Sequence, residues 1–423
     1  MRRPLELIHA LNPRLPRSVQ LLQTGGLLNA FGNGIVYPFL FIYLHNVHGF
    51  RAGTVGLILA TNGAVSLVAG PISGALVDRF GGRRTLAGAL VVLTLGYGSY
   101  ALVVAPWQGF LASVGAGIGN GAFWPAQSSL LAGLTHPEQR PAAWAMQRVT
   151  MNLGFGLGGV VGGLIASTSH PATFKTLFVV DAATFLAYMV VLLARVPYLA
   201  PARREEAPGT YADVLRHRIF LAVIGLNALF ITAGFAQLEL LPAFMKNEAG
   251  VSETGVGIVF FVNTVVIVVA QLPVTTLAGG RRRMRVLASL GAVWGLAWAL
   301  TPVVGALAAG ASATVLFALT QVVFAVGECL HGAVQGPLVV DLAAPGLIGR
   351  YMALSAFSWQ LGFTIGPAVG GFLLGLWPPA LFLAAAAGCT VAGLAALALE
   401  PSLPREARRS PMRSEPALAA ELP

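Results

Sequence analysis

The chain has 423 residues, of which 10% are charged and 56% are hydrophobic, and its mean hydropathy is +0.76. Soluble globular proteins carry about 25% charged residues, so this composition excludes an ordinary soluble domain and indicates a lipid environment. The net charge of +10 does not indicate a nucleic-acid-binding protein, because most basic residues lie in short segments between long apolar runs, as the positive-inside rule predicts for a membrane protein.

Twelve apolar stretches are long enough to cross a bilayer, which takes about 20 residues. Backbone polar groups in hydrocarbon are satisfied in helices or closed barrels, and continuous runs of this length predict helices. The sequence therefore predicts an all-α membrane protein with twelve transmembrane helices. In chain order the predicted spans are 20–44, 53–77, 85–105, 107–134, 142–166, 174–196, 219–245, 255–278, 286–308, 311–340, 351–376 and 379–399.

The segments outside the spans are polar. Residues 1–19 form an N-terminal segment without a cleavable signal peptide, residues 197–218 a linker, and residues 400–423 a tail that we expect to be disordered. With a cytoplasmic N-terminus, the basic residues placed at the outer face are Arg51, Lys175 and Lys246. This distribution predicts a multi-pass protein of the cytoplasmic (inner) membrane with both termini in the cytoplasm.

The second half of the chain repeats the first. LGFGLGGVVGG at 153–163 and LGFTIGPAVGG at 361–371 share seven of eleven residues at an offset of 208. Six spans are therefore followed by six related spans, which predicts two pseudo-symmetric six-helix bundles over 20–196 and 219–399. Parallel repeats of this kind are typical of transporters, whose substrate site lies between the halves near the midplane.

The repeated stretches are rich in glycines spaced four residues apart. Such glycines share one helix face and let two backbones approach closely in lipid. Packing within one bundle and packing at a seam between two moving halves both fit this pattern. The positions concerned are Gly154, Gly158, Gly162, Gly163, Gly362, Gly366, Pro367, Gly370 and Gly371.

The loop between the second and third spans reads GALVDRFGGRR at 74–84 and resembles motif A of the major facilitator superfamily, G-x-L-x-D-R-x-G-R-[RK]. The resemblance implies the major facilitator fold. It also implies a gate in which Asp78 docks on the inner end of the eleventh span near Arg350. The residues that match the motif are Gly74, Leu76, Asp78, Arg79, Gly81, Arg83 and Arg84.

Two further motifs of this superfamily are matched in part. The fifth span resembles motif C, G-x-x-x-G-P-x-x-G-G, which is associated with antiporters, with Gly159 in place of its proline; the eleventh span has Pro367 there. Ser113 stands where motif B has an arginine, and Arg148 is the nearest substitute unless it is a positive-inside anchor. From 20 to 400 the chain is most similar to the twelve-span drug:proton antiporter group, which includes multidrug efflux proteins.

Polar side chains within spans are functional candidates, because lipid burial of such groups is costly. The resemblance implies that spans 1, 4, 7 and 10 line a cavity, and helical spacing places their polar residues on shared faces. Structural interhelical hydrogen bonds are the alternative for each Asn or Gln. The predicted proton and substrate cavity comprises Glu328, Glu239, His331, Gln335, Asn120, Trp124, Gln127, Asn29, Asn33, Tyr37 and Gln237.

Three acidic residues in the spans have different expected roles. Glu328 is our first choice for the coupling proton, since its repeat partner is the neutral Asn120, and Glu239 is the second. A structural role, with Glu328 hydrogen-bonded to the fourth span, is the alternative. For Asp181 in the sixth span we expect a structural hydrogen bond or a pairing with a neighbouring helix. His331 has no second ligand at metal spacing, so neither a metal nor another cofactor is predicted.

The sequence thus predicts a secondary active transporter that works by alternating access. Carboxylates without Lys or Arg in the cavity spans favour proton-coupled efflux of cationic or neutral amphipathic molecules. A proton-coupled, sugar-like nutrient symporter is the alternative. The sequence has no GxxxxGK[ST] loop, which argues against an ATP-driven pump, and no catalytic cluster, which makes a membrane-embedded enzyme remote. The expected partners are a small-molecule substrate, protons and the lipid bilayer, without nucleic acid, and the protein is expected to be a monomer.

Overall fold

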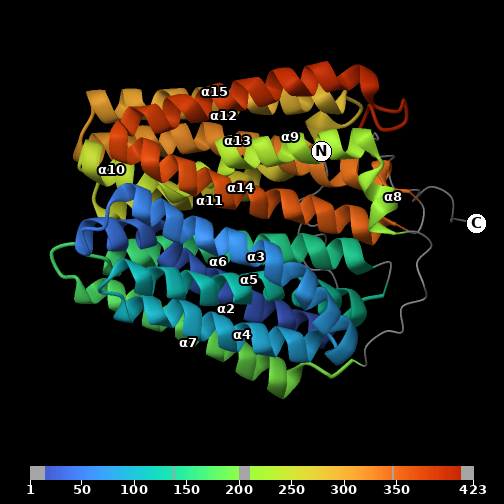
Figure 1. Ribbon diagram of the computed structural model, residues 1–423, viewed down its shortest axis with the longest axis horizontal. Helices are drawn as coiled ribbons and strands as arrows, with labels where there is room; N and C mark the ends of the chain where they lie inside the picture. The colour runs from blue at the N-terminus through green and yellow to red at the C-terminus, as the bar shows by residue number, and fades with distance from the viewer. Residues whose placement is uncertain (1–14, 137–138, 200–209, 345–346, 411–423) are drawn as a thin grey trace, which may run out of the picture.

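The computed structural model describes residues 15–136, 139–199, 210–344 and 347–410. Two helical bundles lie side by side, one above the other in the view of Figure 1, and their helices run roughly along the long axis of the molecule. We call them the N half and the C half. Of the predicted outer segments, residues 1–14 and 411–423 lie outside the described residues, as do residues 200–209 of the linker.

The N half contains six long helices, and α2 ends in a π-helical turn, η1. Their bounds are α2 (Arg17–Ile42), η1 (Tyr43–Val47), α3 (Ala52–Phe80), α4 (Gly82–Ser99) with η2 (Tyr100–Leu102), α5 (Pro106–Leu134), α6 (Arg140–Ile165) and α7 (Ala172–Arg195).

A short linker helix, α8 (Tyr211–Leu215), precedes the C half. The C half then follows as α9 (Arg218–Ala233), η4 (Phe235–Glu239), α10 (Leu241–Ala249), α11 (Glu253–Ala278), α12 (Arg283–Leu307), α13 (Gly310–Leu342), α14 (Ile348–Leu376), α15 (Pro378–Leu399) and η5 (Glu400–Ser402).

Eleven segments of the described chain are long and apolar enough to cross a membrane. The helix predicted as the fourth span, α5, is not among them, although it has 29 residues and packs against α3 and α4. Its sequence contains repeated glycines, as in VGAGIGNG, and glycine adds close packing rather than hydropathy. The all-α membrane fold with two six-helix bundles is confirmed, and α5 completes the six long helices of the N half.

The predicted seventh span, 219–245, is not a continuous helix. α9 ends at Ala233, Gly234 has φ −97° and ψ −80°, and a 3₁₀ segment leads into α10. A Cβ atom at Gly234 would collide with the ring of Trp294, and Pro242 at the start of α10 lacks an amide hydrogen. The side-chain amide of Gln237 donates to the carbonyl oxygen of Thr232 at 2.6 Å, which satisfies one carbonyl that the break releases.

The two ends of the molecule differ in how the halves meet. We call the end where α2 begins and α15 ends the terminal face, and the other end the opposite face. Toward the opposite face one apolar cluster joins the halves, including Phe39, Val55 and Phe260. At the terminal face the N half has a cluster of its own around Leu90 and Leu192. The halves are thus closed together at the opposite face.

The glycine stripes pack mainly within each half. A Cβ atom at Gly154 would lie 2.7 Å from the carbonyl oxygen of Leu27 on α2, and Gly162 is equally close to α2. In the C half, Gly362 and Gly366 pack in the same way on the segment around Thr232. The stripes therefore serve the contact between the first and fifth helix of each half.

Glycines beside these stripes form the seam between the halves. A Cβ atom at Gly163 would lie 2.6 Å from the carbonyl oxygen of Glu253 on α11, and one at Gly371 would lie 2.7 Å from the carbonyl oxygen of Ala52 on α3. These two glycines are repeat partners at the offset of 208. The seam thus has the same pseudo-symmetry as the sequence.

The first part of the tail is ordered, so the expectation of disorder is wrong for residues 400–410. This segment returns to the loop before α12, where the amide of Arg283 donates to the carbonyl oxygen of Arg408 at 2.8 Å. Glu400 pairs with Arg282 at 2.9 Å and with Arg285 at 3.5 Å. Arg283 is fully buried and pairs with Asp341 on α13. The basic loop before α12, which the positive-inside rule explains only as a topology anchor, therefore also binds the first part of the tail.

Candidate transport cavity

A cavity of about 280 Å³ is formed mainly by the N half and is completed by three residues of the C half, Glu239, Gln360 and Phe363. Its wall is rich in aromatic rings. Among its lining residues Glu239 is the only charged one, and none is basic. The aromatic lining residues are Tyr37, Phe41, Tyr97, Tyr100, Trp124, Phe155 and Phe363.

Glu239 reaches the cavity because the seventh span is broken. It is the last residue of the 3₁₀ segment η4, so it lies at the break rather than on the side of a continuous helix. Tyr37 on α2 lines the same cavity, and its hydroxyl group interacts with the Glu239 carboxylate. The contact joins the two halves. Discontinuous helices recur at the binding sites of secondary transporters, where they expose polar groups at the midplane.

A polar network covers the N-half wall. The side-chain amide of Asn120 on α5 donates to Asn62 Oδ1 on α3 at 3.3 Å and to the Tyr97 hydroxyl on α4 at 3.2 Å. Together with Asn33, these residues line the cavity. Asn33, Tyr37, Asn120, Trp124 and Glu239 are therefore the sequence-predicted site residues that the cavity brings together. Asn62 and Tyr97 were not predicted, because they lie on helices that the resemblance does not assign to the cavity.

Glu328 lies outside the lining of this cavity. Its carboxylate accepts a hydrogen bond of 2.8 Å from the side-chain amide of Asn263 on α11. In the N half the equivalent helices carry the Asn120–Asn62 contact, and both pairs are related by the sequence repeat. The Glu328–Asn263 pair is thus the C-half copy of an interhelical contact, which corresponds to a structural role for Glu328.

The other predicted residues of α13 point into the C half. His331 Nε2 lies 2.7 Å from Asn227 Oδ1 on α9, and its ring stacks against Trp294 with the centroids 6.0 Å apart. Gln335 is 5% exposed and is likewise absent from the cavity lining. The helical face that joins these residues to Glu328 therefore packs against neighbouring helices.

The remaining predicted amides also lie behind the cavity wall. Asn29 and Gln127 are 2% and 1% exposed, and in each the side-chain oxygen has no hydrogen-bond partner among the described residues. Gln237 bonds within the broken segment and contacts Gly370. Helical spacing could place these residues on the cavity side, but it could not separate the lining layer from the layer behind it.

Arg148 lies at the seam. Its Nη1 atom would be 3.2 Å from a Cβ atom at Gly332 on α13, and Gln271 of α11 is at a similar distance from that point. The side chain therefore reaches from the N half to the C half. This position differs from that of a motif B arginine, which would lie within α5.

The motif A loop ties together helices of the N half. Gly81 ends α3 with φ +83° and ψ 155°, which L side chains rarely adopt. Arg83 donates to the carbonyl oxygens of Leu192 and Leu193 at the end of α7, at 3.3 and 2.5 Å. Arg84 lies 4.8 Å from the ring centroid of Tyr198. Contacts within the N half therefore explain the presence of Arg83 and Arg84 in this loop.

The other motif A residues have separate surroundings. Arg79 lies over the ring of Phe80, and Arg350 lies over the ring of Tyr211 at 5.8 Å. A Cβ atom at Gly74 would meet no atom within 4 Å. Docking of Asp78 near Arg350 stays a prediction.

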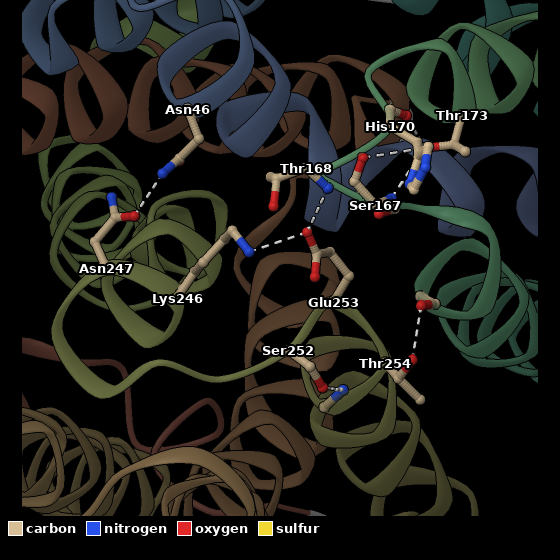
Figure 2. Close-up of polar contacts among 12 residues, drawn as sticks. Asn46, Ser167, Thr168, His170, Thr173, Lys246, Asn247, Ser252, Glu253 and Thr254 are labelled. Carbon is tan, nitrogen blue, oxygen red and sulfur yellow. Dashed lines mark hydrogen bonds and ion pairs between the residues drawn. The ribbon is translucent and has the colours of Figure 1, made fainter.

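A polar cluster joins the halves at the opposite face (Figure 2). Glu253 Oε1 accepts hydrogen bonds from Lys246 Nζ at 3.0 Å and from the backbone amide of Thr168 at 2.9 Å. The amide of Asn46 donates to Asn247 Oδ1 at 2.5 Å. We call these five residues the opposite-face latch. Because the latch lies where the two halves are closed together, it is positioned to hold that end shut.

These features define a membrane transporter with two helical halves and a central cavity. The sequence profile of the Major Facilitator Superfamily matches residues 23–310 and 235–422. The chain belongs to this family, and it is a secondary transporter of small molecules rather than an enzyme.

Known proteins of this family resemble the chain over most of its length. The MFS-type transporter YqjV of Bacillus subtilis is 27% identical over 385 residues, covering 88% of this chain and 91% of YqjV. The multidrug resistance protein MdtH of Aeromonas salmonicida is 24% identical over 353 residues, covering 83% and 86%. A crystal structure of the peptide transporter POT with sulfate has a TM-score of 0.77 at 16% identity, covering 95% of this chain and 99% of that one.

Proposed function

We propose that this protein exports cationic or neutral amphipathic small molecules in exchange for protons. The observation that carries the proposal is the position of Glu239, a single carboxylate in a cavity with aromatic walls and no basic lining residue. Aromatic faces and a carboxylate attract organic cations. The similarity to MdtH, a multidrug resistance protein, supports the same class of substrate.

Glu239 supplies a simple basis for exchange. Its carboxylate can bind either a proton or a cationic substrate, so the occupancy of one excludes the other. The hydroxyl of Tyr37, on the other half, interacts with this group, so the charge on Glu239 affects a contact across the cavity. We therefore place Glu239 ahead of Glu328 as the group that couples substrate and proton. Glu328 stays a candidate whose charge change would act through Asn263.

Three parts of the proposal concern the surroundings of the protein. The positive-inside rule places the terminal face, and so both termini, in the cytoplasm of a cell with the protein in its inner membrane. A reporter that is active only outside the cytoplasm should be silent when fused after Pro423. Activity of that reporter would reverse the orientation. We further propose a monomer, which light scattering of the detergent-solubilised protein tests.

The experiment is transport by the purified protein in proteoliposomes with an imposed pH gradient. Tetraphenylphosphonium, a neutral amphipathic dye and a panel of sugars are the probes. Export predicts that the cation accumulates on the acidic side of the membrane and that Glu239→Gln abolishes this accumulation. Glu328→Gln tests the second candidate, and Glu248→Gln, an exposed acid on α10 outside the cavity lining, is the matched control.

The two candidate functions give different results. Accumulation of a sugar together with protons, on the alkaline side, would replace export by nutrient symport. Gradient-driven accumulation of the cation by Glu239→Gln at the parental rate would remove Glu239 from the coupling step.

A further inference from the structure

The carboxyl group of Asp181 on α7 is the most isolated acidic group in the described structure. The residue is fully buried, and neither carboxylate oxygen has a hydrogen-bond partner among the described residues. The hydroxyl of Thr184, on the same helix, donates to the Asp181 backbone carbonyl at 2.7 Å and also lies beside the carboxyl group. Among the described residues the carboxyl group therefore has no partner on a neighbouring helix, so the expected pairing there is wrong, whereas a structural hydrogen bond to Thr184 of its own helix stays a prediction.

No positive charge of the described residues balances Asp181. α7 packs against α2, α4, η2 and α6. The α2 surface at this point is Gly32, and the titratable group that α4 presents is the hydroxyl of Tyr97. On η2 the nearest titratable group is Tyr100, and α7 itself carries Tyr188. None of the described salt bridges includes Asp181. Burying an unpaired carboxylate is so costly that such a group takes up a proton instead.

Asp181 lies one layer behind the cavity wall. Gly32, which its carboxylate contacts, precedes the lining residue Asn33. Tyr97 also lines the cavity, and its ring packs on Phe185 with the centroids 5.7 Å apart. Phe185 is four residues after Asp181, so both lie on the same face of α7. Tyr97 thus packs on the face of α7 that carries Asp181 and also belongs to the polar network of the cavity.

A row of polar atoms continues from Asp181 toward the terminal face. The side-chain oxygens of Asn29 and Gln127 and the hydroxyl of Tyr188 are buried and have no partner among the described residues. All lie along α2, since Tyr188 contacts Gly25 and Gln127 Nε2 would lie 3.4 Å from a Cβ atom at Gly26. Buried polar groups normally have hydrogen-bond partners. A row of polar groups without protein partners is therefore suited to binding water, along which protons can move.

We infer that Asp181 is a proton-binding site of the N half, connected to the cavity through Tyr97 and to the terminal face through Asn29, Gln127 and Tyr188. The equivalent helix of the C half, α15, contains no charged residue from Pro378 to Leu399. Helix packing in this fold therefore does not require the acid. The inference rests on the proposed function, because it adds a second proton to the same exchange cycle.

Infrared spectroscopy tests the proton directly and without transport. The chain has four aspartates, Asp78, Asp181, Asp213 and Asp341, so protein labelled with carboxyl-¹³C aspartate separates them from every glutamate. A protonated aspartic acid band is expected at about pH 7, where an exposed aspartate is ionised. Asp181→Asn should remove that band. Absence of the band from the parental protein would overturn the inference even if the variant does not fold.

Transport then tests whether this proton takes part in the cycle. The Asp181→Asn protein is expected to lose gradient-driven accumulation of tetraphenylphosphonium while it still equilibrates the cation down its own gradient. Parental gradient-driven accumulation by this variant would make the proton a structural one and overturn the inference. Failure of the proposed function is a separate result, in which the parental protein itself ignores the pH gradient although the infrared band is present.

Discussion

The backbone amide of Thr168 in the N half donates a 2.9 Å hydrogen bond to Glu253 in the C half, and Lys246 holds the same carboxylate oxygen at 3.0 Å. The interaction joins the loop after α6 to the first residue of α11. It is part of the opposite-face latch, so breaking it should favour opening at that face.

We expect Glu253→Ala to shift the equilibrium toward an open opposite face by about 1.5 kcal/mol, or roughly tenfold, the size of a charge-assisted hydrogen bond. Spin labels at His170→Cys and Ala309→Cys report the separation of the halves. Glu248→Ala, an exposed acid at the end of α10, is the control and should leave the distances unchanged. Equal distance distributions for Glu253→Ala and the parental protein would contradict a latch.

The two glycines of the motif A loop should respond differently to alanine. At Gly81 the backbone has φ +83°, and an L side chain there costs about 1–3 kcal/mol. At Gly74 the helix is regular and the space around a Cβ atom is empty, so alanine should leave stability equal or raise it by up to about 1 kcal/mol. Unfolding midpoints in detergent measure both. A Gly81→Ala midpoint equal to that of the parental protein would refute the strain argument.

Packing within a half and packing at the seam can be separated by a second glycine pair. Gly158→Ala would push a methyl group into the backbone of α2 within the N half, and overpacking of this kind costs about 1–3 kcal/mol of stability. Gly163→Ala meets α11 of the other half, so it should open the opposite face with a smaller effect on unfolding.

Gly225→Ala is the control for both variants, since a Cβ atom there meets nothing within 4 Å. Unfolding midpoints and the spin-label distances described above distinguish the two effects. If Gly163→Ala lowered the midpoint as much as Gly158→Ala and left the distances unchanged, the assignment of Gly163 to the seam would be wrong.

Acid should weaken the structure around His48. Burial lowers the pKa of His48, and the ammonium group of Lys175 lowers it further. A lowered pKa means that the folded state favours the neutral ring. The stability that His48 contributes is therefore present above the unfolded value of about 6.5 and is lost as the pH falls from there toward the lowered folded value.

The unfolding midpoint should accordingly fall over this pH interval, and His48→Gln should flatten that part of the curve. His136→Gln, on an exposed loop, serves as the control and should keep the parental slope. An unchanged slope in His48→Gln would assign the effect to other groups.

Local patterns in the sequence determine the membrane fold. Hydropathy averaged over windows of span length predicts the helices, because a segment that crosses lipid must satisfy its backbone hydrogen bonds internally. The offset of 208 residues predicts the two halves, and the structure repeats it down to the pairs Gly163 with Gly371 and Asn120 with Glu328. The sequence also marks Glu239 as a candidate, second to Glu328, because any carboxylate within a span is costly and therefore conspicuous.

Tertiary structure decided which of these candidates meet. The helix break at Gly234 depends on Trp294, some sixty residues later in the chain, so no local pattern marks it. That break turns Glu239 toward Tyr37, whereas Glu328 is engaged by Asn263 and Asp181 is enclosed by α2 and α4. Helical periodicity assigns a residue to a face of its own helix. Whether that face meets lipid, a neighbouring helix or a cavity depends on the packing of distant segments, which sets the partner and the solvation of each polar group.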